Sequence, residues 1–126
     1  MLKDAPIIPY IPVSDLARAR KFYQDVIGLV PKEEVNGGIV YECGNGTTAF
    51  MYVSGGAGTS KASQLFWPVK NIKAEVAALK SRGLAFERYD MPGMQMDDDI
   101  LDSGGAMAAW FKDSEGNIMA IVQNTG

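Results

Sequence analysis

Residues 12–16 read Pro-Val-Ser-Asp-Leu and residues 68–72 read Pro-Val-Lys-Asn-Ile, so one short pattern occurs twice in the chain. In each copy a glycine follows the valine, 15 residues later at Gly28 and 14 residues later at Gly83. Each copy therefore has room for one helix that begins near the pattern and ends at a glycine. An internal repeat of this kind indicates two copies of one supersecondary unit.

The residues around the first copy predict a helix and several strands. Ser14 or Asp15 can cap a helix whose apolar residues recur three or four positions apart, and Gly28 can end it. Prolines at every third position before Val13 remove hydrogen-bond donors, so the first strand is expected at a sheet edge. Two strong hairpin signals divide the remaining strands, Asn36-Gly37-Gly38 and Asn45-Gly46. The first half therefore predicts a βαβββ unit, with a helix at 16–27 and strands at 5–13, 29–35, 39–43 and 47–53.

The second half repeats this order. Asn71 can cap a second helix, and Gly83 can end it. An acidic loop from Asp90 to Gly105 is expected, long enough to suggest a role in function. Strands are predicted at 65–69, 84–89, 106–112 and 117–123. The fold class is thus α+β, a single domain over residues 1–126 with module one at about 1–53, a Gly- and Ser-rich linker at about 54–63, and module two at about 64–126.

The composition excludes several classes of partner. The formal charge is −3 and no large Lys/Arg cluster occurs, so nucleic acid is not expected to bind. The apolar runs have the length of strands, which predicts no membrane association. A single cysteine, Cys43, cannot form an internal disulfide, and the chain has no histidine to activate a thiolate. We therefore expect a cytoplasmic protein.

Two segments resemble the vicinal oxygen chelate superfamily, which contains glyoxalase, the bleomycin resistance proteins and the extradiol dioxygenases. They are Val13–Tyr23 together with Gly28-Leu29, and Ala109–Ile118. The resemblance implies a glyoxalase-like fold, in which two tandem βαβββ modules form a curved mixed sheet around a central cavity that binds a small molecule. It also implies a homodimer, since a second copy can cover exposed sheet edges.

Metal-dependent members of this superfamily hold a divalent ion on side chains from both modules. Counted from the shared motifs, the ligand positions fall here on Ile8, Phe50, Gln64 and Ala120. Three of these side chains cannot coordinate a metal, and one neutral amide is insufficient. The dense carboxylate group at 97–102 lacks the spacing of an EF-hand and is interpreted as a solvated acidic loop. We therefore predict no metal and no other cofactor.

The resemblance also fixes which strand residues face the cavity, because side chains alternate between the two faces of a strand. On this basis the predicted ligand-binding residues are Tyr10, Thr48, Phe50, Tyr52, Gln64, Phe66 and Trp110. The residues of opposite parity should pack beneath the helices: Ile7, Ile11, Ala49, Met51, Leu65, Trp67, Val69, Met119 and Ile121. An aromatic lining suits a flat or largely apolar ligand, with the acidic loop as a rim or partial lid. The alternative is that these aromatics close the space on one another.

Two functions of different class fit these residues. The first is a metal-free binding protein of the bleomycin resistance type, which holds an aromatic or largely apolar ligand. The second is a metal-independent isomerase or lyase acting on a small carbonyl compound, with Glu42 or a tyrosine as acid and base. A metal-dependent glyoxalase or dioxygenase is disfavoured by the missing ligands. No catalytic residue is assigned, because the candidate carboxylates have no evident partner in the sequence: Glu33, Glu34, Glu42 and Asp90.

Overall fold

The strands form two sheets, one from each half of the chain. The computed structural model describes residues 1–89 and 96–126. The first sheet has the order β1-β4-β3-β2 and the second β5-β9-β8-β7-β6. In each sheet the first strand of the module pairs parallel with the last one, and the other neighbours are antiparallel. The bounds are β1 Tyr10–Val13, β2 Val30–Val35, β3 Gly38–Glu42, β4 Thr48–Val53, β5 Leu65–Pro68, β6 Met96–Asp97, β7 Ile100–Asp102, β8 Ala106–Lys112 and β9 Ile118–Asn124.

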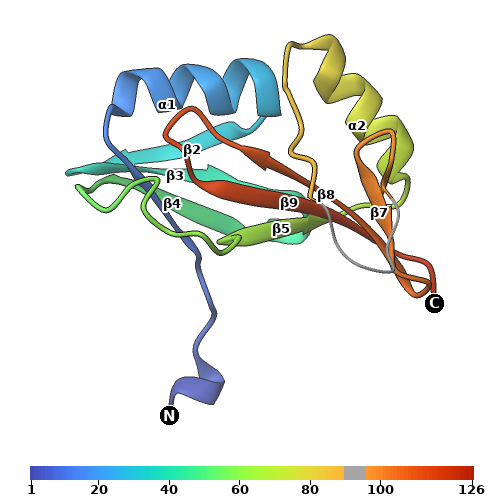
Figure 1. Cartoon of the computed structure of the whole chain (residues 1–126). Helices are drawn as coiled ribbons and strands as arrows, with labels where there is room; N and C mark the ends of the chain where they lie inside the picture. Colours follow the sequence, from blue (N-terminus) through green and yellow to red (C-terminus); the bar gives the residue numbers. More distant parts are fainter. Residues whose placement is uncertain (90–95) are drawn as a thin grey trace.

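Both predicted helices form, and both lie on the same side of the sheets (Figure 1). Helix α1 (Leu16–Phe22) begins at Asp15, whose side chain accepts a hydrogen bond from the Arg18 amide, and continues as the π-helical turn η2 (Tyr23–Ile27). Helix α2 (Ile72–Ser81) is capped in the same way by Asn71. The remaining helical turns are short, η1 (Leu2–Asp4) and η3 (Gly44–Gly46). Within residues 1–89 and 96–126, no helix is both long and apolar enough to cross a bilayer.

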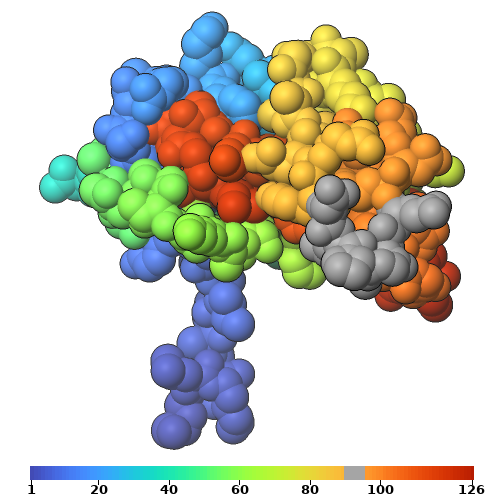
Figure 2. Space-filling model, viewed as in Figure 1, coloured from blue at the N-terminus to red at the C-terminus, as the bar shows by residue number. Residues whose placement is uncertain are grey.

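The core lies between the helices and the sheets and takes residues from both modules. Of the side chains predicted to pack there, five are buried and three are half-buried against the same cluster. Ile7 is the exception, and that prediction is wrong: its exposed fraction is 93%. Strand β1 begins only at Tyr10, so residues 1–9 form an N-terminal arm that projects from the body (Figure 2). The confirmed core residues are Ile11, Ala49, Met51, Met119 and Ile121, with Leu65, Trp67 and Val69 half-buried.

The predicted strand at 84–89 does not form. Within it only Phe86 makes a bridge to β8, opposite Phe111. The strand that lies beside β8 is instead β7, inside the segment predicted as a loop, because Ile100 and Leu101 are buried when β7 pairs with β8. Asp98 and Asp99 connect β6 to β7, and both have a positive φ. This backbone conformation is typical of a tight two-residue hairpin turn. The prediction of a loop throughout 90–105 is therefore wrong for 96–102, while residues 90–95 lie outside the described part.

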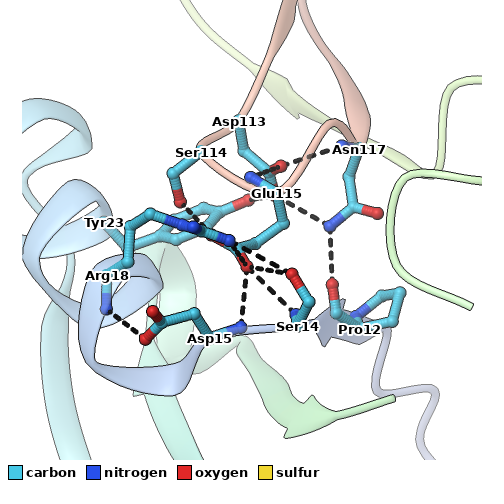
Figure 3. A network of polar contacts seen from close by, with 9 residues as sticks. All are labelled: Pro12, Ser14, Asp15, Arg18, Tyr23, Asp113, Ser114, Glu115 and Asn117. Atoms are coloured by element: carbon cyan, nitrogen blue, oxygen red, sulfur yellow. Dashed lines mark hydrogen bonds and ion pairs between the residues drawn. The ribbon is translucent and has the colours of Figure 1, made fainter. Parts of the chain in front are cut away.

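A buried carboxylate joins the two modules. The turn between β8 and β9 places Glu115 against the junction of β1 and α1 (Figure 3). The Glu115 side chain is 0% exposed, and its oxygens accept hydrogen bonds from the backbone amides of Ser14 and Asp15 at 3.0 and 2.9 Å. Arg18 donates to the same carboxylate from Nε at 2.9 Å and from Nη2 at 2.9 Å. These donors, Arg18 foremost, hold the pKa of Glu115 well below its ordinary range.

The neighbouring residues of this turn extend the contact. Asp113 accepts a 2.5 Å hydrogen bond from the hydroxyl of Tyr23, a fully buried residue whose pKa is raised by burial and by Asp113. Asn117 donates to the Pro12 carbonyl at 2.7 Å and accepts from the Gly58 amide at 3.0 Å. No buried side-chain nitrogen or oxygen among the described residues lacks a partner. The two modules are thus held together by polar groups that are fully satisfied.

We expect Glu115→Gln to lower the free energy of unfolding at neutral pH by about 2 to 4 kcal/mol, because the amide NH₂ would face donors. The wild-type carboxyl has a lower pKa folded than unfolded, so its stabilisation is present above the ordinary value of 4.5 and is lost as the pH falls below it. Urea unfolding from about pH 6 to about pH 3 should show a smaller pH dependence in Glu115→Gln than in wild type.

The matched control is Glu34→Gln, which breaks the exposed Arg20–Glu34 ion pair. That variant should change stability by no more than about 0.5 kcal/mol. Equal losses in the two variants, or an unchanged pH dependence in Glu115→Gln, would contradict the assignment of Glu115 as the joining residue.

Candidate ligand-binding face

The side of the sheets opposite the helices is not covered by either helix (Figure 1). Large side chains stand on it, because strand alternation turns one set of residues toward the helices and the other set away. Tyr10 is 62% exposed and Phe66 is 58% exposed. We call this surface the aromatic face and define it by Tyr10, Phe50, Tyr52, Phe66 and Trp110.

The aromatic residues of module one form a cluster. Tyr10 lies beside Phe50 in the parallel pairing of β1 with β4, and their ring centroids are 5.9 Å apart. Tyr10 and Tyr52 are 4.8 Å apart, and Phe50 and Tyr52 are stacked at 6.3 Å. Phe50 and Tyr52 are each only half-buried, so the cluster does not close into a core.

A glycine positions the Phe50 ring. A Cβ on Gly38 would lie 2.5 Å from the Phe50 Cζ and would also meet the Met51 carbonyl. Phe50 can therefore lie over β3 only because residue 38 has no side chain. The neighbouring strand β3 also contributes Val40, which pairs with Phe50 in the register.

The aromatic residues of module two lie on either side of Ala120. Phe66 on β5 and Trp110 on β8 both pair with Ala120 on β9, which is buried. Trp110 makes an edge-to-face contact with Tyr89 at 5.6 Å, and burial raises the pKa of Tyr89. Tyr89 thereby extends the aromatic face beyond the predicted residues.

Within residues 1–89 and 96–126, five of the seven predicted residues line three pockets. The Tyr10 pocket, of about 270 Å³, contains Tyr10, Thr48 and Phe50 together with Ile8 and Val40. The Cys43 pocket, of about 350 Å³, lies between the β3–β4 turn and β5, and its lining includes Cys43, Thr48 and Phe66. The Trp110 pocket, of about 280 Å³, is lined by Lys61, Ser63, Tyr89, Trp110 and Ile118.

These pockets bring together some of the predicted residues and leave others apart. Thr48 lines both the Tyr10 pocket and the Cys43 pocket, so these two are neighbours. Tyr52 contacts the aromatic cluster without lining any of the three, and Gln64 is exposed just before β5. Val40 could have been found from its register opposite Phe50. Cys43 and Tyr89 end the predicted strands 39–43 and 84–89, but neither lies within a strand of the structure, so strand alternation could not place them.

The titratable groups near the face form no evident acid–base pair among the described residues. Glu42 is exposed at the end of β3, opposite Thr48. Glu34 is ion-paired with Arg20, Glu33 is exposed, and Asp90 lies outside the described residues. Burial raises the pKa of the Cys43 thiol, outweighing the opposite effect of a hydrogen bond with Trp67, so this cysteine stays a neutral thiol at pH 7.

The chain matches a known family over residues 7–121, the glyoxalase/bleomycin resistance protein/dioxygenase superfamily. The chain belongs to this superfamily. No curated protein matches it.

Solved structures share the fold at low sequence identity. A virulence protein from Salmonella typhimurium has a TM-score of 0.71 at 18% identity, with 99% of this chain and 100% of that chain covered. A lactoylglutathione lyase from Agrobacterium tumefaciens has a TM-score of 0.65 at 18% identity, with coverage of 94% and 93%. An antibiotic binding protein from Streptomyces sp. CB03234 has a TM-score of 0.64 at 21% identity, with coverage of 97% and 98%.

The metal that some members of the superfamily carry does not fit the residues present here. The positions that the resemblance assigns to metal ligands hold one amide, Gln64, and three side chains without a donor atom. Within the described ranges, no three His, Cys, Asp or Glu residues are grouped to hold an ion. The carboxylates of the β6–β7 turn are instead paired with cations, since Lys80 lies 2.8 Å from Asp99 and 3.1 Å from Asp98.

We expect Gly38→Ala to displace the Phe50 ring and to lower the free energy of unfolding by about 1 to 3 kcal/mol, because the added methyl meets both the ring and a backbone carbonyl. The control is Gly44→Ala, where a Cβ would have no atom within 4 Å. Thermal melting of both variants tests this. Equal melting temperatures would show that Phe50 does not depend on Gly38 for its place.

Proposed function

We propose that this member of the superfamily is a metal-free protein that binds an aromatic or largely apolar small molecule on its aromatic face. One observation carries the proposal: Tyr10, Phe50 and Tyr52 are packed against one another beside a pocket and yet remain partly open to solvent. Exposed aromatic surface of this extent has no role in the core. Its burial by a flat ligand would be favourable at about 25 cal/mol for each Å² removed from water.

The surroundings of the pockets favour binding over chemistry. The polar groups at the Tyr10 and Cys43 pockets are few, with Thr48 shared between them and Cys43 held as a neutral thiol. Such a lining can orient a ligand through single hydrogen bonds but offers no strong acid or base. The antibiotic binding protein with the same fold is a precedent for this kind of function.

We further propose that the protein is a cytoplasmic homodimer in which the second copy covers part of the aromatic face. The N-terminal arm is apolar and projects from the body, with Ile7 93% exposed and Ile8 52% exposed. Both β1 and β5 are edge strands, and their prolines limit further strand pairing. Contact between two copies would then be made by apolar side chains of the arm and the face.

Replacing Phe66 or Tyr52 by alanine should weaken the binding of a flat apolar probe such as anilinonaphthalene sulfonate by about 1 to 3 kcal/mol, because an aromatic contact is lost. Neither variant should change the melting temperature by more than a few degrees, since Phe66 is exposed and Tyr52 is only half-buried. Gln64→Leu should change which ligands are accepted.

The control is Phe111→Ala in the buried core, which should lose about 3 to 5 kcal/mol of stability. If Phe66→Ala and Tyr52→Ala lose stability on that scale while probe binding is unchanged, the face is structural and the proposal fails.

Incubation with a metabolite extract, followed by identification of what co-purifies, tests the function itself. A ligand returned intact supports a binding protein, whereas a ligand returned altered would favour the isomerase or lyase, and Glu42→Gln would then be the first variant to examine. One equivalent of zinc, nickel, iron or manganese retained after dialysis would contradict the metal-free part of the proposal.

Sedimentation at micromolar concentration should give twice the mass of the 13.6 kDa chain. Ile7→Asp should shift the protein toward the monomer, because a buried charge without a partner opposes association. Lys3→Asp, in the same arm but already polar, serves as the control. A wild-type protein with the mass of one chain would refute the dimer and would leave the small-molecule site to be judged by probe binding.

A further inference from the structure

A further cavity lies on the opposite side of the sheets from the aromatic face, between α2 and the end of η2. Its volume is about 150 Å³. Ile27 and Leu29 come from module one, and the other lining residues come from module two. We call it the junction cavity, and its apolar lining includes Ile27, Leu29, Trp67, Val69, Leu79 and Ile121.

One wall of the junction cavity is flat and fixed. Trp67 stacks on Phe111 with ring centroids 6.1 Å apart and an interplanar angle of 15°. Phe111 is fully buried and also packs against Phe86, so it cannot turn away easily. An aromatic wall held in this way favours a flat, apolar occupant.

The polar lining comes from α2 and the residue that ends it. Glu75 and Arg82 are seven residues apart, which places them on one helix face, and both are exposed. Arg82 Nη1 donates to the Val26 carbonyl at 3.2 Å and so reaches across to module one. A ligand hydroxyl can donate to a carboxylate or accept from a guanidinium, so either side chain can hold it.

The volume limits the size of the occupant. An apolar protein cavity of roughly 150 Å³ accommodates one benzene ring. The pockets of the aromatic face are larger, at about 270 to 350 Å³. A two-ring molecule suited to the aromatic face would be only partly enclosed by the junction cavity, whereas a single ring can lie within it.

We propose that the junction cavity is a second small-molecule site, specific for a neutral single-ring hydroxyarene. The ring lies against Trp67, and the hydroxyl donates to Glu75 or accepts from Arg82, which stand about two helical turns apart. The junction cavity lies on the other side of the sheets from the aromatic face, although Trp67 lines both this cavity and the Cys43 pocket. The proposal does not depend on the function proposed for the aromatic face.

The test uses phenol as the probe and follows the two indole N–H signals of the protein by NMR. Trp67→Phe and Trp110→Phe identify which signal belongs to which tryptophan. On titration the Trp67 signal should shift and saturate, while the Trp110 signal on the aromatic face should not shift. Because Trp67 also lines the Cys43 pocket, the shift is assigned to the junction cavity only if Leu79→Phe removes it and Phe66→Ala does not. At least one of Arg82→Ala and Glu75→Ala should weaken phenol binding about three- to tenfold, the value of one hydrogen bond.

Two further variants make the result decisive. Leu79→Phe should abolish the Trp67 shift by filling the cavity, and Phe66→Ala on the aromatic face should leave phenol affinity unchanged. The proposal is overturned if Trp67 does not respond at about 10 mM phenol, or if only Trp110 responds. Unchanged affinity in both Arg82→Ala and Glu75→Ala would also overturn it, and these exposed positions can be replaced without loss of the fold.

Discussion

The burial of the Glu115 carboxylate determines how the two halves of this protein are placed. A carboxylate removed from water is costly unless charge and hydrogen bonds compensate it. Here the compensation comes from the other module, through the first amides of the β1–α1 junction and the guanidinium of Arg18 (Figure 3). The cost of separating the modules is therefore not only the exposure of apolar surface but also the loss of partners for a buried charge.

That arrangement has a consequence for the surfaces of the molecule. With the β8–β9 turn fixed against the start of α1, both helices cover the same side of the sheets and the core forms between them. The other side is left to side chains that the helices do not reach. The same strand alternation that fills the core with Met51 and Met119 thus turns Phe50 and Ala120 toward the open side.

The chemistry of the open side sets this chain apart from the metal-dependent members of its superfamily. Phe50 and Ala120 stand at positions where the resemblance places metal ligands, and neither side chain can coordinate an ion. What remains is a surface of aromatic rings with few polar groups. Gly38 contributes to this surface because its lack of a side chain leaves room for the ring of Phe50.

The sequence by itself determined the repeat, both helices with Asn71 and one of Ser14 or Asp15 as their caps, and the core residues of β1, β4, β5 and β9. These features depend on neighbours within a few positions or on strand alternation, which a sequence displays directly. Only the tertiary structure showed that the β6–β7 hairpin, and not a strand at 84–89, lies beside β8. The reason is that Ile100 and Leu101 become buried only when β7 pairs with β8. Long-range contacts also decided the exposure of Ile7, the distribution of the described site residues over several pockets, and the partners of Glu115. Each depends on contacts between residues far apart in the chain, and no local pattern specifies which distant groups will meet.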